Sequence, residues 1–186
     1  MDRIESRILA FMALMAAGAG SAAAQGVQAP IRNQTPDQPL PYPTAEVVVE
    51  AGAELSCTIS LPKGVGDGAA PGAVLLTVAG ANDRDQTHSG HRPYLVLADH
   101  LARNGIASIR CDDRGVGGST GSLSDASMED LRDDALAMHA RLSSESGIGA
   151  VGFIGNSEGS VVGAMAASEA GEEAAFVILL GGVGVG

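Results

Sequence analysis

Residues 149–170 of this 186-residue chain read GAVGFIGNSEGSVVGAMAASEA. The apolar run 149–154 is typical of a buried strand, and the Ala-rich run 158–170 predicts a helix. Between them, Gly155-Asn156-Ser157-Glu158-Gly159 fits the pattern G-x-S-x-G. A serine on such a strained strand-to-helix turn projects from the top of a sheet, as a nucleophile must. We expect a nucleophile at Ser157; a glycine-rich turn whose serine merely caps the helix is the alternative.

The rest of the chain alternates strands and helices around this stretch. Two β-rich pieces, 46–50 and 55–61, are joined by a short Gly-containing connector and predict an antiparallel hairpin. The Gly- and Pro-rich segment 62–72 predicts a loop. Further strands are expected at 73–78, 106–110 and 175–180, and further helices at 91–104 and from Ser124 or Ser127 to Leu142. This order predicts an α/β fold with a mainly parallel sheet and helices on both faces.

Two loops at the carboxyl ends of strands accompany the Ser157 turn, and ligands bind at that edge of such sheets. The loop 79–85 follows the first long strand, where a backbone N–H for an oxyanion hole is expected. We assign that N–H to Ala81, with Asn82 as the near alternative, and the second N–H to Glu158 at the start of the helix. A polar turn in which the charged residues 83–85 pair with each other is the competing interpretation.

Glycines and charged residues are expected to brace the site. Gly155 and Gly159 leave room for close backbone approach at the turn. The loop 112–119 carries Asp113, Arg114 and Gly115, and an arginine flanked by carboxylates usually holds a loop by charge-assisted hydrogen bonds. We interpret these residues as scaffold for the site.

Several linked motifs resemble a known family. They are DRDQT at 83–87, GHRPY at 90–94, LADHL at 97–101, GIA at 105–107, DDRGVGGS at 112–119 and GNSEG at 155–159. Together they are similar to exported bacterial α/β-hydrolases of the serine aminopeptidase-like and dienelactone-hydrolase-like branches, over residues 45–186. The resemblance implies acyl-ester hydrolysis by a Ser-His-Asp triad with Ser157 as nucleophile and the N–H groups of Ala81 and Glu158 as oxyanion hole.

The triad is incomplete in this chain. In the α/β-hydrolase order the acid and then the histidine follow the serine, but residues 158–186 contain four Glu and no His. We therefore expect an incomplete α/β-hydrolase domain at 45–186 with its C-terminal strands missing, a bare hydrophobic edge at 175–180, and no activity for the chain alone. His88, His91, His100 and His139 precede the serine, so a triad role for any of them would reverse the order.

Composition restricts the partners. The net charge is −11, which opposes nucleic-acid binding because phosphates need a basic surface. No Gly-Lys-Ser/Thr occurs, so a P-loop is excluded, and the glycines near 115–118 do not fit a dinucleotide-binding pattern. We expect no cofactor and no metal, and a small-molecule ester or peptide-like substrate. The oligomeric state is left open.

The first residues predict export. Residues 1–24 combine a weakly basic start, an apolar run and small residues before Gln25, as in a signal peptide. Residues 25–44 contain five prolines and read as a linker. The protein is therefore expected in the periplasm or secreted, without a stable membrane anchor; an uncleaved anchor is the alternative. In an exported protein Cys57 and Cys111 can pair, but each also fits a strand as a free apolar residue.

Three function classes remain open. A serine esterase acting through an acyl-enzyme is favoured. An aminopeptidase or a lactone hydrolase on the same scaffold is the close alternative. A non-catalytic remnant gains weight from the missing histidine.

Overall fold

The computed structural model describes residues 35–64 and 69–182. The predicted signal peptide and the first part of the predicted linker lie outside these residues. Over the described residues, no helix is long and apolar enough to cross a membrane.

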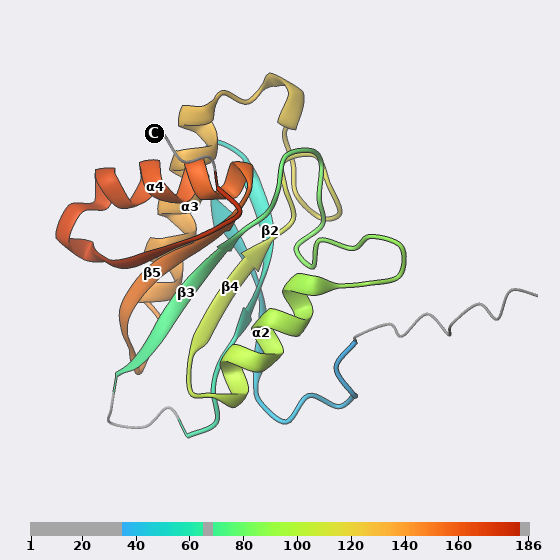
Figure 1. Cartoon of the computed structure of the whole chain (residues 1–186), viewed down its shortest axis with the longest axis vertical. Helices are drawn as coiled ribbons and strands as arrows, with labels where there is room; N and C mark the ends of the chain where they lie inside the picture. Colours follow the sequence, from blue (N-terminus) through green and yellow to red (C-terminus); the bar gives the residue numbers. More distant parts are fainter. Residues whose placement is uncertain (1–34, 65–68, 183–186) are drawn as a thin grey trace, which may run out of the picture. The chain divides into compact units, whose positions relative to one another are not determined.

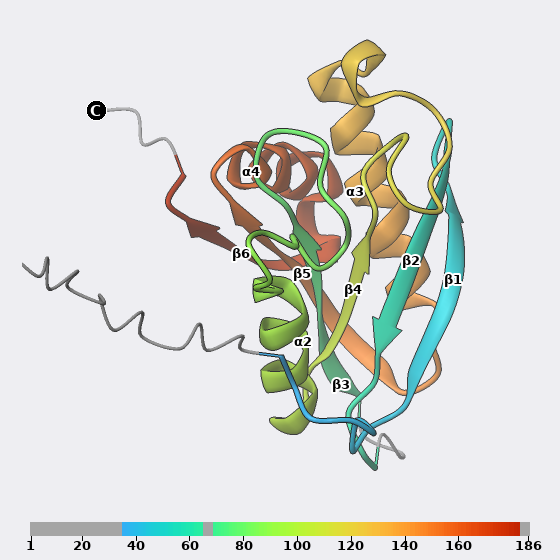
Figure 2. The same cartoon turned by 90° about the vertical axis from the view of Figure 1, so that its right-hand side faces the viewer.

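A single mixed sheet of six strands organises the described part of the chain, in the order β1-β2-β4-β3-β5-β6 (Figures 1 and 2). The strands are β1 Thr44–Glu50, β2 Glu54–Ser60, β3 Ala70–Leu76, β4 Ala107–Cys111, β5 Ile148–Asn156 and β6 Ala174–Leu180. The pairs β3–β4, β3–β5 and β5–β6 are parallel, whereas β1–β2 and β2–β4 are antiparallel. The predicted fold class, with its N-terminal hairpin and mainly parallel sheet, is confirmed.

Helices cover both faces of the sheet. They are α2 Pro93–Arg103, α3 Met128–Ser143 and α4 Glu158–Ala170. Alternate side chains of β3 point to opposite faces. Val74 and Leu76 belong to the core beneath α3 and α4, whereas Ala73 and Leu75 pack with residues of α2. The loops predicted to build the site follow the ends of three strands: β3 at Leu76, β4 at Cys111 and β5 at Asn156.

The beginning of β3 corrects one sequence prediction. The segment 62–72 was expected to be a loop, but β3 already begins at Ala70 and so includes Pro71 and Gly72. The register with β5 shifts between Ala70 and Gly72. Strand prolines and glycines are found at such irregularities. A Cβ on Gly72 would lie 2.9 Å from a Leu142 methyl group, so close packing accounts for this glycine.

Ser127 begins α3 with a capping box. Its hydroxyl accepts from the Asp130 N–H while the Asp130 carboxylate accepts from the Ser127 N–H. Of the two serines considered from the sequence, Ser127 is therefore the cap, and Ser124 lies in a short 3-10 turn, η1 (Leu123–Asp125). This reciprocal cap satisfies two backbone donors at the helix start.

The edge strand β6 leaves an apolar surface uncovered within the described residues. Val177, Ile178, Leu179 and Leu180 are 39–51% exposed, and Ala174–Leu180 carries no charged side chain. Figure 2 shows β6 at the end of the sheet opposite β1. The expected hydrophobic edge is present, and such an edge promotes association.

We expect Leu179→Lys to reduce aggregation of the chain severalfold, because a charge on an edge strand opposes strand addition. Its effect on the free energy of unfolding should stay within about 1 kcal/mol, since Leu179 is 51% exposed. Light scattering against protein concentration measures the first effect and chemical denaturation the second. Val48→Lys is the matched control, because Val48 is 59% exposed on the opposite edge, between Glu46 and Glu50. Equal improvement in both variants would show that general charge, not the β6 edge, controls association.

Candidate active site

Ser157 occupies the turn between β5 and α4 with a positive φ of 52° and a ψ of −114°. Such a backbone costs energy for a residue other than glycine and is found mostly at functional sites. The Ser157 N–H donates to the Leu180 carbonyl at 2.9 Å, and its carbonyl accepts from the Ser160 N–H at 3.0 Å. The residue is exposed. The turn thus presents a serine to solvent on a backbone held from both sides.

The two flanking glycines allow this turn to close. A Cβ on Gly155 would lie 2.0 Å from the Gly159 carbonyl oxygen. A Cβ on Gly159 would lie 2.4 Å from the carbonyl oxygens of both Leu76 and Thr77. All of these obstacles are backbone atoms, so neither position accommodates a side chain. Gly155 is therefore explained by the close approach of the first turn of α4, and Gly159 by the close approach of the end of β3.

The loop after β3 separates the two candidates for the first oxyanion donor. The Asn82 N–H donates to Asp113 Oδ2 at 2.8 Å, so it is already engaged. The Ala81 N–H has no acceptor among the described residues, and Ala81 is exposed. The Asn82 side chain holds the loop further by donating to the carbonyls of Val78 and Gly80. The geometry favours Ala81 over Asn82 as a free donor.

Glu158 supplies the second free N–H. It is the first residue of α4, and the first N–H groups of a helix have no intrahelical acceptor. Ser157 makes no side-chain cap to them. The partial positive charge at a helix start also favours an anion there. Glu158 and Gly80 line the same cavity, which places the α4 start and the β3 loop around one space.

That cavity has a volume of about 60 Å³. It lies between the ends of β3 and β4, the inner face of α3 and the first turn of α4. Most of its lining is apolar and includes Val78, Leu131, Met138 and Val162, with Asp113 among the polar groups. The cavity is smaller than the roughly 300–1,000 Å³ of drug-sized ligand sites, and neither Ser157 nor Ala81 is among its lining residues.

Asp113 is half-buried beside the β3 loop. Its carboxylate accepts from the Asn82 N–H and from the Thr77 hydroxyl, the latter at 3.1 Å. Burial raises the pKa of Asp113 to about 6, against these hydrogen bonds, which lower it. Among the described residues no cation pairs with it. Asp113 therefore connects the loop after β4 to the loop that carries Ala81.

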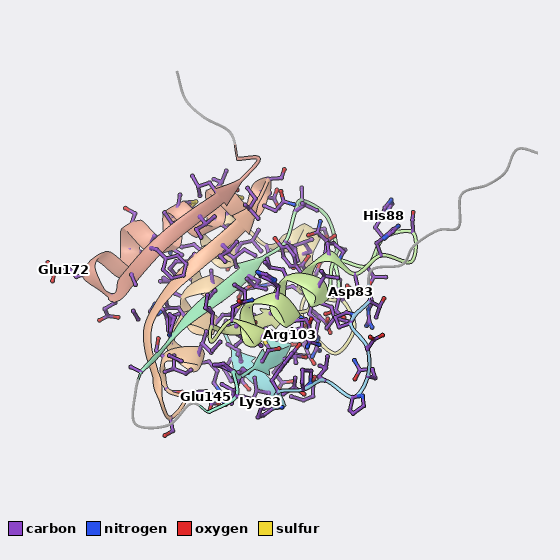
Figure 3. All side chains as sticks on the ribbon, turned by 60° about the horizontal axis from the view of Figure 1, so that its bottom comes forward. Lys63, Asp83, His88, Arg103, Glu145 and Glu172 are labelled. Atoms are coloured by element: carbon purple, nitrogen blue, oxygen red, sulfur yellow. A yellow bond between two sulfur atoms is a disulfide. The ribbon has the colours of Figure 1, made fainter. Side chains whose placement is uncertain are left out.

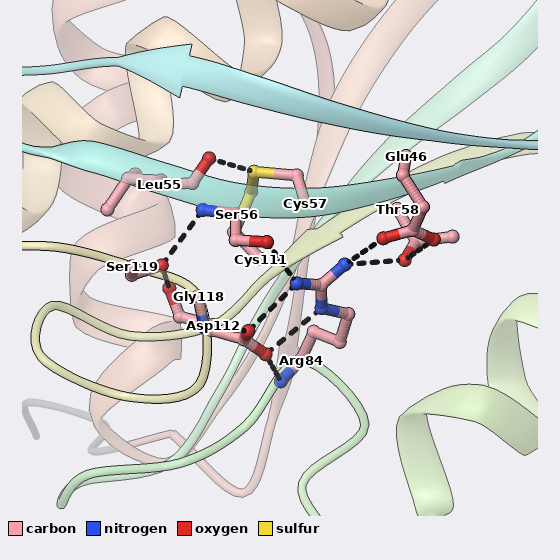
Figure 4. The surroundings of a disulfide bond; sticks show 10 residues. All are labelled: Glu46, Leu55, Ser56, Cys57, Thr58, Arg84, Cys111, Asp112, Gly118 and Ser119. Carbon is pink, nitrogen blue, oxygen red and sulfur yellow. Dashed lines mark hydrogen bonds and ion pairs between the residues drawn. A yellow bond between two sulfur atoms is a disulfide. The ribbon is translucent and has the colours of Figure 1, made fainter.

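Asp112 makes the second connection between these loops, through Arg84. Its carboxylate accepts from the Arg84 N–H at 2.9 Å and from the guanidinium at 2.8 and 3.0 Å. Burial works to raise the pKa of Asp112, but the hydrogen bonds from Arg84 and Gly118 outweigh it and leave the pKa below its usual value. Arg84 also donates to Thr58 and Ser56 of β2 and pairs with Glu46 of β1 (Figure 4).

A third buried contact lies next to this one. Asp85 pairs with Arg110 of β4 at 2.8 Å, and both side chains are at least nine-tenths buried. The ion pairs of Arg84 and Asp85 therefore reach outside residues 83–85, with Arg92 as a second partner of Asp85, and within this stretch the Asp85 N–H donates to the Asp83 carboxylate at 3.1 Å. Sequence reasoning missed both true partners. The sequence does contain a signal for these pairs. Arg110 and Asp112 are two residues apart, so in an extended chain their side chains lie on the same side.

Arg114 and Gly115 lie in the loop after β4, and Arg114 lines the same cavity as Gly80 of the β3 loop. Arg114 pairs with Asp134 of α3 through two bonds of 2.7 and 2.8 Å and donates to the Ala51 carbonyl of the hairpin turn. Gly115 has φ +76°, and a Cβ there would meet the Gly121 carbonyl oxygen at 3.0 Å. Arg114 therefore fastens the loop to α3 and to the hairpin turn, as a scaffold would, and Gly115 allows the loop to fold close to Gly121.

The four histidines are accounted for elsewhere in the fold. His139 is buried, stacks on Phe153 with ring centroids 5.3 Å apart and lies 3.2 Å from the Val151 carbonyl. His100 is exposed on α2. His88 and His91 are exposed and pair through their backbones; Figure 3 shows His88 in the loop before α2. Within residues 35–64 and 69–182, the Ser157 hydroxyl has no hydrogen-bonded imidazole or carboxylate, and no cluster of ligands is placed to hold a metal.

Comparison with known proteins identifies the family. The model of the family described as serine aminopeptidase, S33, matches residues 70–184, which is more than half of the chain. The match spans the strand β3, the Ser157 turn and β6. The chain belongs to this family. The serine aminopeptidase S33 family is a hydrolase family, in agreement with the resemblance drawn from the motifs.

Solved structures share the fold of this S33 family member. Est1E from Butyrivibrio proteoclasticus, solved with ferulic acid, has a TM-score of 0.59 and 19% identity, covering 70% of this chain and 50% of its own. A hypothetical protein from Pseudomonas aeruginosa has a TM-score of 0.64 and 19% identity, covering 80% and 45%. Dienelactone hydrolase from Anabaena variabilis has a TM-score of 0.59 and 20% identity, covering 76% and 64%.

The present chain spans about half the length of the first of these structures. A search of curated proteins finds no significant match. At these identities the structural likeness establishes the α/β-hydrolase fold, and the chemistry rests on the site itself.

Proposed function

We propose that this protein is a serine esterase that forms an acyl-enzyme at Ser157. The conformation of the Ser157 turn carries the proposal. An exposed serine is held at positive φ between a strand and a helix, and its flanking glycines meet backbone atoms that exclude any side chain. A turn that merely capped the helix would show a hydroxyl bonded to the helix start, and Ser157 makes no such bond.

Two free N–H groups support acyl transfer. When the Ser157 oxygen attacks an ester carbonyl, negative charge develops on the carbonyl oxygen. The N–H groups of Ala81 and Glu158 supply donors for that charge, because each lacks an acceptor among the described residues. The hydroxyl proton passes to a base, the carbon–oxygen bond of the leaving alcohol breaks, and water later releases the acid.

The base is the component that the described residues do not bring to Ser157. A serine hydroxyl is a weak nucleophile without an adjacent base. We therefore infer that the 186-residue chain alone hydrolyses esters no faster than its Ser157→Ala variant. A non-catalytic role for this chain is the alternative, and turnover by the chain that Ser157→Ala abolishes would exclude it.

The experiment is turnover of p-nitrophenyl esters by the full-length gene product. Ser157→Ala should lower kcat by at least about 10⁴-fold, because removing a triad member leaves only the contribution of binding and the oxyanion hole. Ser124→Ala is the control, since Ser124 lies in the η1 turn. Unchanged turnover in Ser157→Ala would refute the proposal. Amino-acid p-nitroanilides and lactones tested alongside would identify an aminopeptidase or a lactone hydrolase.

We also propose export to the periplasm or secretion, with a small-molecule ester or peptide-like substrate. The Cys57–Cys111 disulfide supports export, because structural disulfides persist in oxidising compartments. Mass spectrometry of the N-terminus of the native protein tests it. A mature N-terminus at Gln25 is expected, and an intact Met1 or Asp2 in the purified protein would contradict it.

A further inference from the structure

The Cys57–Cys111 disulfide lies at the level of the sheet where β4 ends and the site loops begin. Cys57 of β2 and Cys111 of β4 are direct cross-strand partners, with Cα atoms 3.9 Å apart. Cys111 is the last residue of β4, and Asp112 and Asp113 follow it at once. Cys111 also lines the cavity shared by Glu158 and Gly80. The disulfide is therefore a neighbour of the site.

Arg84 connects the loop of Ala81 to both strands that the disulfide joins. On the β2 side it donates to Ser56 and Thr58, the two residues that flank Cys57. On the β4 side it is held by three hydrogen bonds to Asp112, the residue after Cys111 (Figure 4). One rigid guanidinium fork thus spans β2 and the end of β4. It satisfies both sets of acceptors only while the two strands keep their spacing.

The loop after β4 is fastened to β2 at the same level. The Asp112 N–H donates to the Ser56 carbonyl at 2.9 Å, and the Ser56 N–H donates to the Ser119 hydroxyl at 2.9 Å. A Cβ on Gly118 would lie 2.7 Å from the Ser56 hydroxyl oxygen, so the loop and strand are in close contact. Movement of β2 against β4 here would displace the loops on both sides of the site.

We propose that Cys57 and Cys111 are positioning residues for the oxyanion donor at Ala81. The disulfide holds β2 and β4 at the spacing that Arg84 bridges, and Arg84 fixes the loop three residues after Ala81. This inference rests on the proposed function at Ser157 and adds to it a dependence of catalysis on the redox state of the disulfide. Reduction by a dithiol would break the S–S bond; each sulfur would gain one electron and one proton, and the dithiol would be oxidised to its own disulfide.

Hydrogen exchange of the intact and the dithiol-treated chain tests whether the disulfide holds the two loops in place. Reduction should speed amide exchange in peptides covering 79–86 and 112–120 by about tenfold or more, because the cross-link no longer restrains local opening. Peptides of α4 should be unchanged. The double variant Cys57→Ala/Cys111→Ala should behave like the reduced chain with and without dithiol. Unchanged exchange in both loops, or equal acceleration across the whole domain, would overturn the proposal.

Kinetics of the full-length gene product test whether catalysis depends on the disulfide. Loss of one oxyanion donor should lower kcat by about 100-fold with KM little changed, since the donor acts mainly on the transition state. Ile59→Val is the control. It weakens the core on the same strand, where Ile59 faces Ile109 of β4, without touching either loop. A normal kcat in the reduced enzyme would refute the positioning role. If the oxidised enzyme shows no Ser157-dependent turnover, the proposed function fails, and hydrogen exchange still decides whether the disulfide holds the loop.

Discussion

Asp113→Asn is expected to stabilise the folded chain at pH 7, by about 3 kcal/mol at most. Burial raises the pKa of Asp113 from 3.8 to about 6, and each pKa unit corresponds to about 1.4 kcal/mol. A raised pKa means that the folded state holds the proton more tightly than the unfolded state. The stability contributed by the protonated acid is therefore complete below about pH 4 and is lost as the pH rises through about 6. The side-chain amide of Asp113→Asn stays neutral, so the variant retains this stability at pH 7.

Urea denaturation of both proteins between pH 4 and pH 8 measures this effect. The free energy of unfolding of the wild type should fall relative to that of Asp113→Asn as the pH rises, and the two should converge near pH 4. Asp112→Asn is the matched control at the next residue. It should destabilise by about 3 kcal/mol at pH 7, because it breaks the pairing of a buried carboxylate with Arg84. A less stable Asp113→Asn at pH 7 would contradict the account.

Gly159→Ala is expected to destabilise the chain by more than about 3 kcal/mol or to prevent folding. The added Cβ would lie 2.4 Å from the carbonyl oxygens of Leu76 and Thr77, so the end of β3 and the start of α4 would have to separate. Overpacking against side chains typically costs about 1–3 kcal/mol, and backbone atoms yield less easily. Thermal unfolding followed by circular dichroism measures the loss.

Gly163→Ala is the control one turn later in the same helix. Its Cβ would lie 3.3 Å from a Leu76 methyl group and 3.5 Å from Phe153, contacts that a flexible side chain can relieve. Alanine also favours a helix over glycine by about 1 kcal/mol. The control should therefore be neutral or mildly stabilising. A similar loss in both variants would show that the helix tolerates no substitution and that the Ser157 turn has no special requirement.

Periodicity predicted most of the fold, because strands and helices leave distinct patterns of apolar residues. The strand before Ser157 and the helix after it were located within one or two residues, since 149–154 and 158–170 are strongly patterned. The beginning of β3 was missed, because Pro71 and Gly72 are typical of loops, whereas the strand here is formed by pairing of Gly72 with Ala107 of β4 and Val151 of β5. Likewise, the end of β3 was placed two residues late.

The sequence predicted the part of the candidate site in which a motif reflects backbone geometry. It did not predict which charged residues of the loops pair with each other. The role of the glycines around Ser157 could be predicted, because the turn itself requires them. The pairing of Arg84 with Asp112 and of Asp85 with Arg110 depends on how a loop crosses two strands, which local sequence does not specify. The pairing of Cys57 with Cys111 was also left undecided from the sequence, because it depends on β2 and β4 being neighbours.

Fluorophosphonate labelling of the full-length gene product tests the central claim most directly. We predict one covalent adduct per molecule, with peptide mapping that places it on Ser157, and no adduct in a folded Ser157→Ala variant. An adduct on another residue, such as the neighbouring Ser160, or a folded wild-type protein that takes up no probe would contradict the assignment of Ser157 as nucleophile.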